Sequence, residues 1–179
     1  MRIDLDHGPD RTPGFLAVTE SIDCLLDSTR LLSMATVGDD GAPWSHNAYF
    51  AYDFDLHLYC LTRPASGHAR NLANSAGRVA VTVADTAQAG TPGTRQGLQL
   101  RGHCQVARGA QLARGAEAFG ARFPVFAAAA RAATEPDPTG SALRLHVFAA
   151  QEFKVFDERA FGPDTWISGR IHREAARAA

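Results

Sequence analysis

The stretch Leu61–Leu72, LTRPASGHARNL, gathers the residues of this sequence that are best suited to bind an anion. Two hydroxyl side chains, Thr62 and Ser66, lie close to the imidazole of His68, and arginines flank them at positions 63 and 70. A helix that begins after Ser66 would add oriented backbone N–H groups and a partial positive charge. The stretch therefore predicts a phosphate-binding turn. The alternative is that Ser66 only caps a helix and that the arginines are solvated.

Alternating apolar and polar residues predict strands on both sides of this stretch. Tight turns join the first three strands, which predicts an antiparallel meander rather than a parallel βαβ arrangement. Helices are expected before the first strand, after the third and, broken at Phe123-Pro124, before the last pair. We expect a mainly β protein with peripheral helices: a six- or seven-stranded antiparallel split β-barrel, Greek-key-like. The short, evenly spaced strands favour closure into a small barrel over an open sheet. The predicted strands are 31–38, 43–52, 56–62, 78–84, 98–106, 143–148 and 153–156.

Two of these strands carry more detailed expectations. In 98–106, Gly102 interrupts the alternation and predicts a β-bulge or the close approach of another backbone. In 43–52, Asn47 and Tyr49 share one face of the strand, whereas His46 and Ala48 point to the other. Asn47 is therefore a candidate ligand-binding residue, with a plain strand position as the alternative. The aromatic residues expected to be buried are Trp44, Phe50 and Tyr52.

Length and composition limit the classes of function. The 179 residues predict one domain at 15–167, with a flexible N-terminal arm at 1–14 and a frayed helical tail at 168–179. The net charge of −1 argues against nucleic-acid binding and against a polybasic membrane surface. No apolar run approaches the ~20 residues of a membrane span, and the acidic N-terminus is unlike a signal peptide. We expect a cytoplasmic protein whose cysteines, Cys24, Cys60 and Cys104, are buried thiols.

Common catalytic and metal-binding motifs are missing from the sequence. There is no GxSxG elbow, no P-loop and no HExxH motif. The 7 histidines are scattered, and none are paired at the helical spacing that zinc ligands require. We therefore predict no metal site and name no catalytic side chain.

The order of the elements and three motifs resemble the pyridoxamine 5′-phosphate oxidase-like family of FMN-binding split barrels. The motifs are T-x-x-x-S-x-H-x-x-N-L at 62–72, GLQLRG at 97–102 and FKVFD at 153–157. The chain is most similar to a small bacterial subgroup of unassigned activity, and the resemblance covers about 31–166. It implies a homodimer with two FMN sites at the subunit interface.

The resemblance also assigns site residues. Thr62, Ser66 and His68 fall where the family holds the FMN phosphate, although lysine is more usual at the position of His68. Asn47, Ala48 and Tyr49 fall where the second strand meets the flavin ring. Gly97 stands where many relatives carry a glutamine that contacts the ring. Trp166 would cover the cofactor of the partner subunit, with simple packing as the alternative.

Two hypotheses of function follow from the resemblance. The first is a flavin-dependent oxidoreductase that acts on an unidentified small molecule, in which the flavin supplies the electron chemistry and the protein positions it. The second is a non-enzymatic binding or sensor protein for flavin, haem or a deazaflavin on the same barrel. The departures at His68 and Gly97 motivate the second hypothesis.

Overall fold

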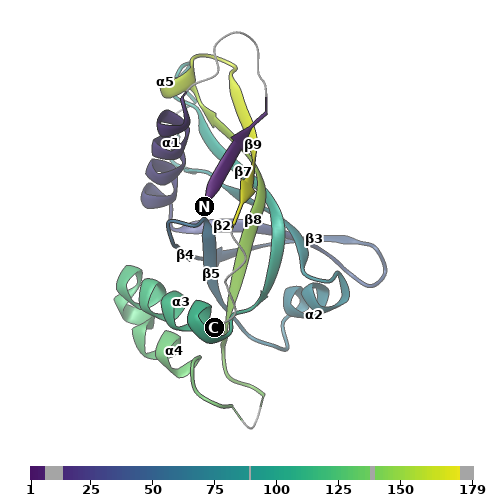
Figure 1. Cartoon of the computed structure of the whole chain (residues 1–179). Helices are drawn as coiled ribbons and strands as arrows, with labels where there is room; N and C mark the ends of the chain where they lie inside the picture. The colour runs from purple at the N-terminus through teal and green to yellow at the C-terminus, as the bar shows by residue number, and fades with distance from the viewer. Residues whose placement is uncertain (7–13, 89, 138–139, 174–179) are drawn as a thin grey trace.

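The computed structural model describes residues 1–6, 14–88, 90–137 and 140–173 of the chain. An antiparallel sheet forms the body of the protein, and helices lie around it (Figure 1). The strands are β1 (Arg2–Leu5), β2 (Leu31–Val37), β3 (Pro43–Tyr49), β4 (Ala51–Tyr52), β5 (His57–Thr62), β6 (Arg78–Val83), β7 (Gln96–Val106), β8 (Arg144–Asp157) and β9 (Trp166–His172). The helices are α1 (Phe15–Ser28), α2 (Gly67–Asn74), α3 (Gly109–Arg122), the 3-10 helix η1 (Pro124–Phe126), α4 (Ala127–Ala132) and α5 (Glu158–Phe161).

The sheet has the strand order β1-β9-β8-β7-β6-β2-β3, with every pair antiparallel. One half of the long strand β8 pairs with β9 and the other half with β5, which in turn pairs with β4. Non-consecutive strands are thus neighbours, β2 beside β6 and β5 beside β8. The prediction of a mainly antiparallel split barrel is confirmed. The expected closure is incomplete, because β3 reaches β4 only along the chain, through Phe50.

Both ends of the chain differ from the prediction. Residues 2–5, expected in a flexible arm, form β1, and residues 168–172, expected in a helical tail, belong to β9. The two strands pair along their length, and Ile3 and Ile171 are buried where they meet. The backbone of β1 passes so close to position 169 that only glycine fits there, since a Cβ would lie 2.6 Å from the Asp4 carbonyl oxygen. The remaining residues of the predicted arm and tail, 7–13 and 174–179, lie outside the described residues.

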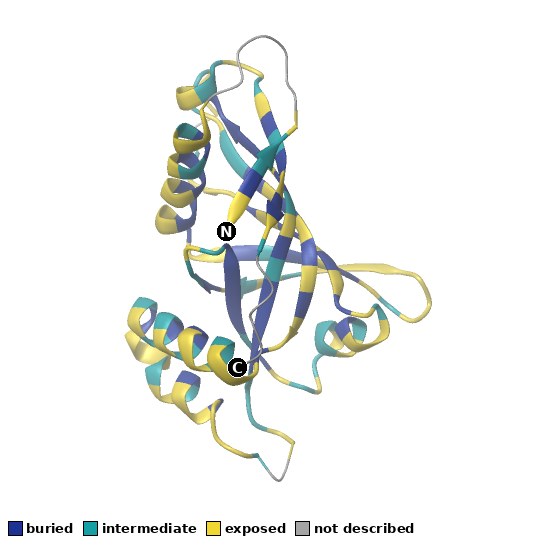
Figure 2. Cartoon of the chain, in the orientation of Figure 1, coloured by how far each residue is buried: buried dark blue, intermediate teal, exposed yellow. Residues whose placement is uncertain are grey.

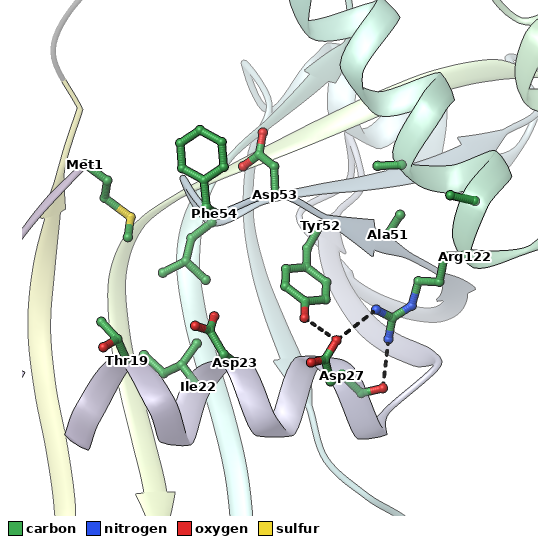
Figure 3. A pocket seen from close by; sticks show the side chains of 13 residues that line it. Met1, Thr19, Ile22, Asp23, Asp27, Ala51, Tyr52, Asp53, Phe54 and Arg122 are labelled. Atoms are coloured by element: carbon green, nitrogen blue, oxygen red, sulfur yellow. Dashed lines mark hydrogen bonds and ion pairs between the residues drawn. The ribbon is translucent and has the colours of Figure 1, made fainter. Parts of the chain in front are cut away.

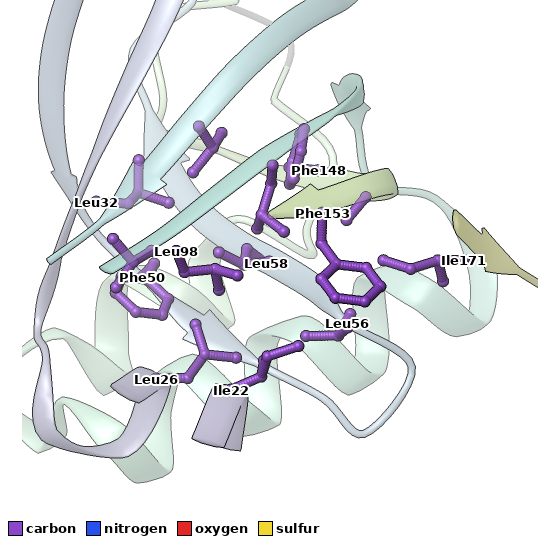
Figure 4. Packing of buried hydrophobic residues seen from close by; sticks show 14 of the residues in the cluster. Ile22, Leu26, Leu32, Phe50, Leu56, Leu58, Leu98, Phe148, Phe153 and Ile171 are labelled. Carbon is purple, nitrogen blue, oxygen red and sulfur yellow. The ribbon is translucent and has the colours of Figure 1, made fainter. Parts of the chain in front are cut away.

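The main core fills the inside of the curved sheet and is covered by α1. Valines of β6 and leucines of β7 alternate between buried and exposed positions, as period-two strands require. Leu26 of α1 packs into the same cluster, which Figure 4 shows together with other members: Ile22, Leu32, Phe50, Leu56, Leu58, Leu98, Phe148, Phe153 and Ile171. A second cluster around Tyr59 and Phe119 lies between the sheet and α3. Within the described residues, no helix is both long and apolar enough to cross a membrane.

The local predictions for Gly102, Trp44 and the cysteines have different outcomes. The register shift in β7 falls between Arg101 and Gly102, and a Cβ on Gly102 would lie 2.1 Å from the Ala149 carbonyl oxygen, so the predicted bulge and close approach are confirmed. The prediction for Trp44 was wrong: 62% of this residue is exposed, because the β2–β3 hairpin extends away from the core (Figure 1). Cys24 is also exposed, since it lies on the outer side of α1, whereas the other two thiols are buried.

The turn between β4 and β5 is organised by the carboxylate of Asp53. Its Oδ1 accepts hydrogen bonds from the backbone N–H groups of Asp55 (3.0 Å) and His57 (3.1 Å). Its Oδ2 accepts the Tyr59 hydroxyl (2.8 Å) and lies 3.1 Å from the His57 ring. Burial alone would raise the pKa of Asp53, but these hydrogen bonds outweigh it and hold the pKa at about 2.

We expect Asp53→Asn to destabilise the protein in a pH-dependent way. The pKa is lower in the folded than in the unfolded state, so the carboxylate stabilises the fold near neutral pH, and this contribution is lost as the pH falls from about 4 to about 2. Urea unfolding should show a loss of about 2 kcal/mol at pH 7. An equal difference between wild type and variant at pH 2.5 would contradict this explanation.

Candidate functional site

The predicted phosphate-binding turn connects β5 to α2, and its local structure follows from the sequence. Strand β5 ends at the buried Thr62, and the Ser66 N–H donates to the Arg63 carbonyl (3.0 Å) in a tight turn. Ser66 is the N-cap of α2, where its Oγ accepts the Ala69 N–H at 3.3 Å. The structure therefore confirms the helix and its cap. Such a cap leaves other N–H groups at the helix start without intrahelical partners, and these are suitable donors to an anion.

A pair of stacked imidazoles lies beside this cap. The ring of His68, on α2, is 3.8 Å from the ring of His46, on β3, with an angle of 10° between the planes. The His68 Nε2 also lies 3.0 Å from the Ser66 Oγ. His46 reaches this position because the inward face of β3 turns toward α2. Among the described residues, the buried Nδ1 of His46 has no hydrogen-bond partner.

A third imidazole belongs to the same region. His146 is 6% exposed and lies on β8 directly opposite Cys60 of β5, near the end of that strand from which the turn leads to α2. Its Nδ1 is buried and has no partner among the described residues. Burial lowers the pKa values of both His46 and His146, and the charge of His68 lowers them further, so His68 lies within electrostatic reach of the other two rings. We call His46, His68 and His146 the histidine cluster.

Burial keeps the histidine cluster neutral. It is the largest influence on all three groups and lowers the pKa of each, for His46 to about 4. Each neutral ring can donate one N–H and accept at its other nitrogen. Fixed positive charge comes from Arg63 and from Arg70, whose guanidinium donates to the Ala65 carbonyl at the same turn. The site thus offers donors and cations to an anion.

The second-strand residues divide between two faces, as predicted. Asn47 and Tyr49 point outward, and Ala48 packs against the core. The Asn47 Oδ1 accepts the Ser33 hydroxyl at 2.6 Å. The Tyr49 ring meets the rings of Phe123 and Phe126 at centroid distances of 5.3 and 5.7 Å. These contacts hold the outer face of β3 in place, next to the inward-facing His46.

Gly97 and Trp166 form a separate group far from the histidine cluster. Gly97 and Trp166 both pair with Phe156 of β8, from opposite sides, and Trp166 stacks on that residue at 4.4 Å. The Lys154 Nζ lies 4.3 Å from the centre of the Trp166 ring. Phe156 is ten residues along β8 from His146, a distance of about 30 Å in an extended strand. One chain therefore does not bring all the predicted site residues together.

A wide cleft lies elsewhere, between α1, the β4–β5 turn and α3 (Figure 3). It has a volume of about 780 Å³ and contains none of the predicted site residues. On one side, the Tyr52 hydroxyl donates to Asp27 at 2.5 Å, and Arg122 donates to the last carbonyls of α1. These bonds join α1, β4 and α3. We interpret the polar groups on this side as structural.

Sequence reasoning missed two members of the histidine cluster. The sequence predicts only that His46 lies on the opposite face of its strand from Asn47 and Tyr49, and this face becomes part of the site because α2 packs against it. His146 carried no local signal, since a histidine in an apolar strand is usually a core residue. Only the pairing of β8 with β5, which are distant in sequence, places it near α2.

Comparisons with known proteins agree with this fold. The family model described as pyridoxamine 5′-phosphate oxidase matches residues 18–154, more than half of the chain. The chain therefore belongs to the pyridoxamine 5′-phosphate oxidase family. Among curated proteins, none matches it significantly in sequence.

Solved structures with the same fold include haem proteins and a member of the pyridoxinephosphate oxidase family. A haem-binding protein from Mycobacterium smegmatis is 19% identical with a TM-score of 0.65, over 90% of this chain and 59% of that one. HutZ, the haem storage protein of Vibrio cholerae, is 19% identical with a TM-score of 0.57, and the match covers 74% of this chain and 89% of HutZ. The third structure is a Clostridium acetobutylicum protein of the pyridoxinephosphate oxidase family, related to general stress protein 26. It is 13% identical with a TM-score of 0.57, and the match covers 86% of this chain and 94% of that one. At these identities the likeness shows the fold alone.

Proposed function

We propose that this chain is a homodimeric FMN-binding protein that acts as a flavin-dependent oxidoreductase on an unidentified small molecule. The observation that carries the proposal is a pair of buried imidazole nitrogens, on His46 and His146, near the capped start of α2. Neither nitrogen has a hydrogen-bond partner in the part of the chain that the structure describes. Buried polar atoms normally have hydrogen-bond partners. A phosphate bound there would supply the missing partners.

The residues at the turn fit the phosphate of FMN. Such a phosphate is close to a dianion near neutral pH and needs several donors and positive charge. Ser66 and Thr62 supply hydroxyl groups, the first turn of α2 supplies backbone N–H groups, and Arg63 supplies charge. The flavin ring would then lie along β3, against Asn47, Ala48 and Tyr49. Bound flavin would supply the electron transfer, and these residues would bind and orient it.

The exposed apolar surface supports the proposal of a homodimer. Tyr49 of β3 is exposed beside its partner Leu31 of β2, and the exposed Phe126 and Val125 of η1 add to this surface. Figure 2 shows that the end of the β2–β3 hairpin is exposed as well. Exposed apolar patches of this kind mark interaction surfaces. In a twofold dimer, the Gly97 and Trp166 group of one chain can complete the site formed by the histidine cluster of its partner. Trp166 would then cover the partner's cofactor.

An FMN titration of the purified protein tests the proposal. We expect binding in the micromolar range or tighter, equivalent to about −8 kcal/mol, and a weaker affinity for riboflavin, which lacks the phosphate. The loaded protein should be reduced by NADH or NADPH and reoxidised by an acceptor. Failure to bind FMN, or equal affinities for the two flavins, would refute the proposed phosphate site.

Gly97→Gln is expected to strengthen flavin binding without affecting the fold. A Cβ at this position would meet no atom within 4 Å, so the larger side chain has room. A glutamine amide could hydrogen-bond the flavin ring, and one such bond contributes about 1 kcal/mol, or a fivefold gain in affinity. Thermal unfolding without ligand should be unchanged, and the gain should be equal for FMN and riboflavin. An unchanged affinity would place Gly97 outside the site.

The second candidate is a non-enzymatic binding or sensor protein for haem. The Nδ1 atoms of His46 and His146, which have no hydrogen-bond partner within the described residues, also favour it, because imidazole is a common ligand of haem iron. Addition of haem should then produce a Soret band that is lost in His46→Ala or His146→Ala. A deazaflavin would instead use the phosphate site, and it should compete with FMN in a titration. We propose a cytoplasmic location for either function, which fits the free thiols.

A further inference from the structure

We propose that the histidine cluster takes up protons when the site binds a phosphate, so that affinity for a phosphorylated flavin rises as the pH falls. This inference rests on the proposed function, and it concerns how the site obtains its positive charge. A lysine at the position of His68 would provide a permanent charge. Here the three side chains that converge on the site are imidazoles, whose charge depends on pH.

The geometry opposes charge on the cluster in the absence of an anion. The stacked rings of His46 and His68 are only 3.8 Å apart, so two imidazolium charges would repel each other strongly. His146 is 6% exposed and would lose most of its hydration if charged. A dianion in contact with the cluster reverses both effects, because it attracts the charged form of each ring and accepts its hydrogen bonds.

The surrounding elements provide no carboxylate that bonds to the cluster among the described residues. Facing it are the neutral groups Met34 and Thr36 of β2, Cys60 and Thr62 of β5, Val106 of β7, and Ser66 and Asn71 of α2. The cationic groups are Arg63 and Arg70 near the turn and Arg144 on β8, which lies 3.5 Å from the carboxylate of Asp137. These cations disfavour further positive charge in the empty site. An incoming phosphate is thus the counter-ion that this environment lacks.

The direction of the pH dependence follows from these pKa values. In the free protein, burial lowers the pKa of all three histidines, for His46 to about 4, so the rings are neutral at pH 7. Bound phosphate raises their pKa values, and the complex therefore holds more protons than its separated components. Affinity should rise as the pH falls through the raised pKa values, down to about pH 6, below which the phosphate itself takes up a proton and loses charge. Each proton taken up corresponds to about a tenfold loss of affinity per pH unit.

Titration calorimetry of the purified protein tests the inference. FMN and riboflavin are each titrated at pH 7 in two buffers that differ in ionisation enthalpy, which gives the number of protons taken up. We expect FMN binding to take up about half a proton or more, and riboflavin binding to take up none. FMN binding without proton uptake would overturn this inference but leave the proposed function intact. Absence of FMN binding from pH 6 to pH 8 would refute both.

Two further measurements locate the protons. In His146→Gln, proton uptake and the pH dependence of the FMN dissociation constant should both decrease, whereas His172→Gln, on an exposed position of β9, should behave as wild type. If His146→Gln does not fold, nitrogen NMR of ring-labelled histidines in the wild type gives the answer directly. At pH 7 the cluster should change from neutral to charged imidazole on addition of FMN. Rings that stay neutral would contradict the proposal.

Discussion

Replacing Ser66 by aspartate is expected to abolish the preference for FMN while leaving the protein as stable as the wild type. Aspartate caps a helix as well as serine does, so α2 should keep its start and its hydrogen bond to the Ala69 N–H. The new carboxylate, however, would lie where the phosphate binds and would repel it. We expect the affinity for FMN to fall about a hundredfold or more, since the variant loses a charge-assisted hydrogen bond and gains a like charge.

Ser66→Ala is the matched control for this experiment. It removes the cap, so it should reduce stability by about 1 kcal/mol, but it adds no negative charge. Its affinity for FMN should therefore lie between those of the wild type and Ser66→Asp. Riboflavin affinity should be similar in all three proteins, because riboflavin has no phosphate to repel. If Ser66→Asp retains full FMN affinity, Ser66 is only a helix cap.

The parts of the fold that were predicted correctly are those that local sequence determines. Strands β6 and β7 alternate apolar and polar residues, and this pattern is sufficient to identify a half-buried strand. Helix α2 has a serine cap at its start, and Phe123-Pro124 separates α3 from the helices that follow. In each case the signal lies within a few residues of the element that it defines.

The parts that were missed depend on contacts between distant segments. The sequence from Gly169 onward is rich in arginine and alanine and favours a helix, but pairing with β1 and β8 makes residues 169–172 a strand. Trp44 lies on the same face of β3 as His46, as the alternation of the strand predicts. The hairpin that carries it extends beyond the core, however, so its side chain is exposed. His146 joins the site only through the pairing of β8 with β5. No window of local sequence contains this information.

The separation of the predicted site residues has a consequence for assembly. The histidine cluster and the group of Gly97 and Trp166 lie at opposite ends of β8, about 30 Å apart along the strand. A flavin is too short to contact both groups in one chain. If both groups contact the cofactor, a complete site requires two chains, each of which contributes a different end of its sheet.

Hybrid dimers are therefore expected to recover flavin binding from two defective variants. Ser66→Asp damages the phosphate end, and Trp166→Ala removes the ring that would cover the partner's cofactor, so each homodimer has two defective sites. A dimer of one Ser66→Asp chain and one Trp166→Ala chain should have one intact site, formed by the histidine cluster of the latter and Trp166 of the former. Co-expression with two affinity tags isolates this hybrid, and titration should show one tight FMN per dimer.

The controls separate this arrangement from simpler ones. Trp166→Phe keeps an aromatic ring against Phe156, so its homodimer should bind FMN nearly as well as the wild type. If Trp166→Ala alone binds FMN normally, Trp166 only packs on its own chain. If the hybrid binds no better than either homodimer, each site lies within a single chain. A single tight site in the hybrid would instead mean that both subunits hold each cofactor, with the phosphate at α2 of one chain and the ring under Trp166 of the other.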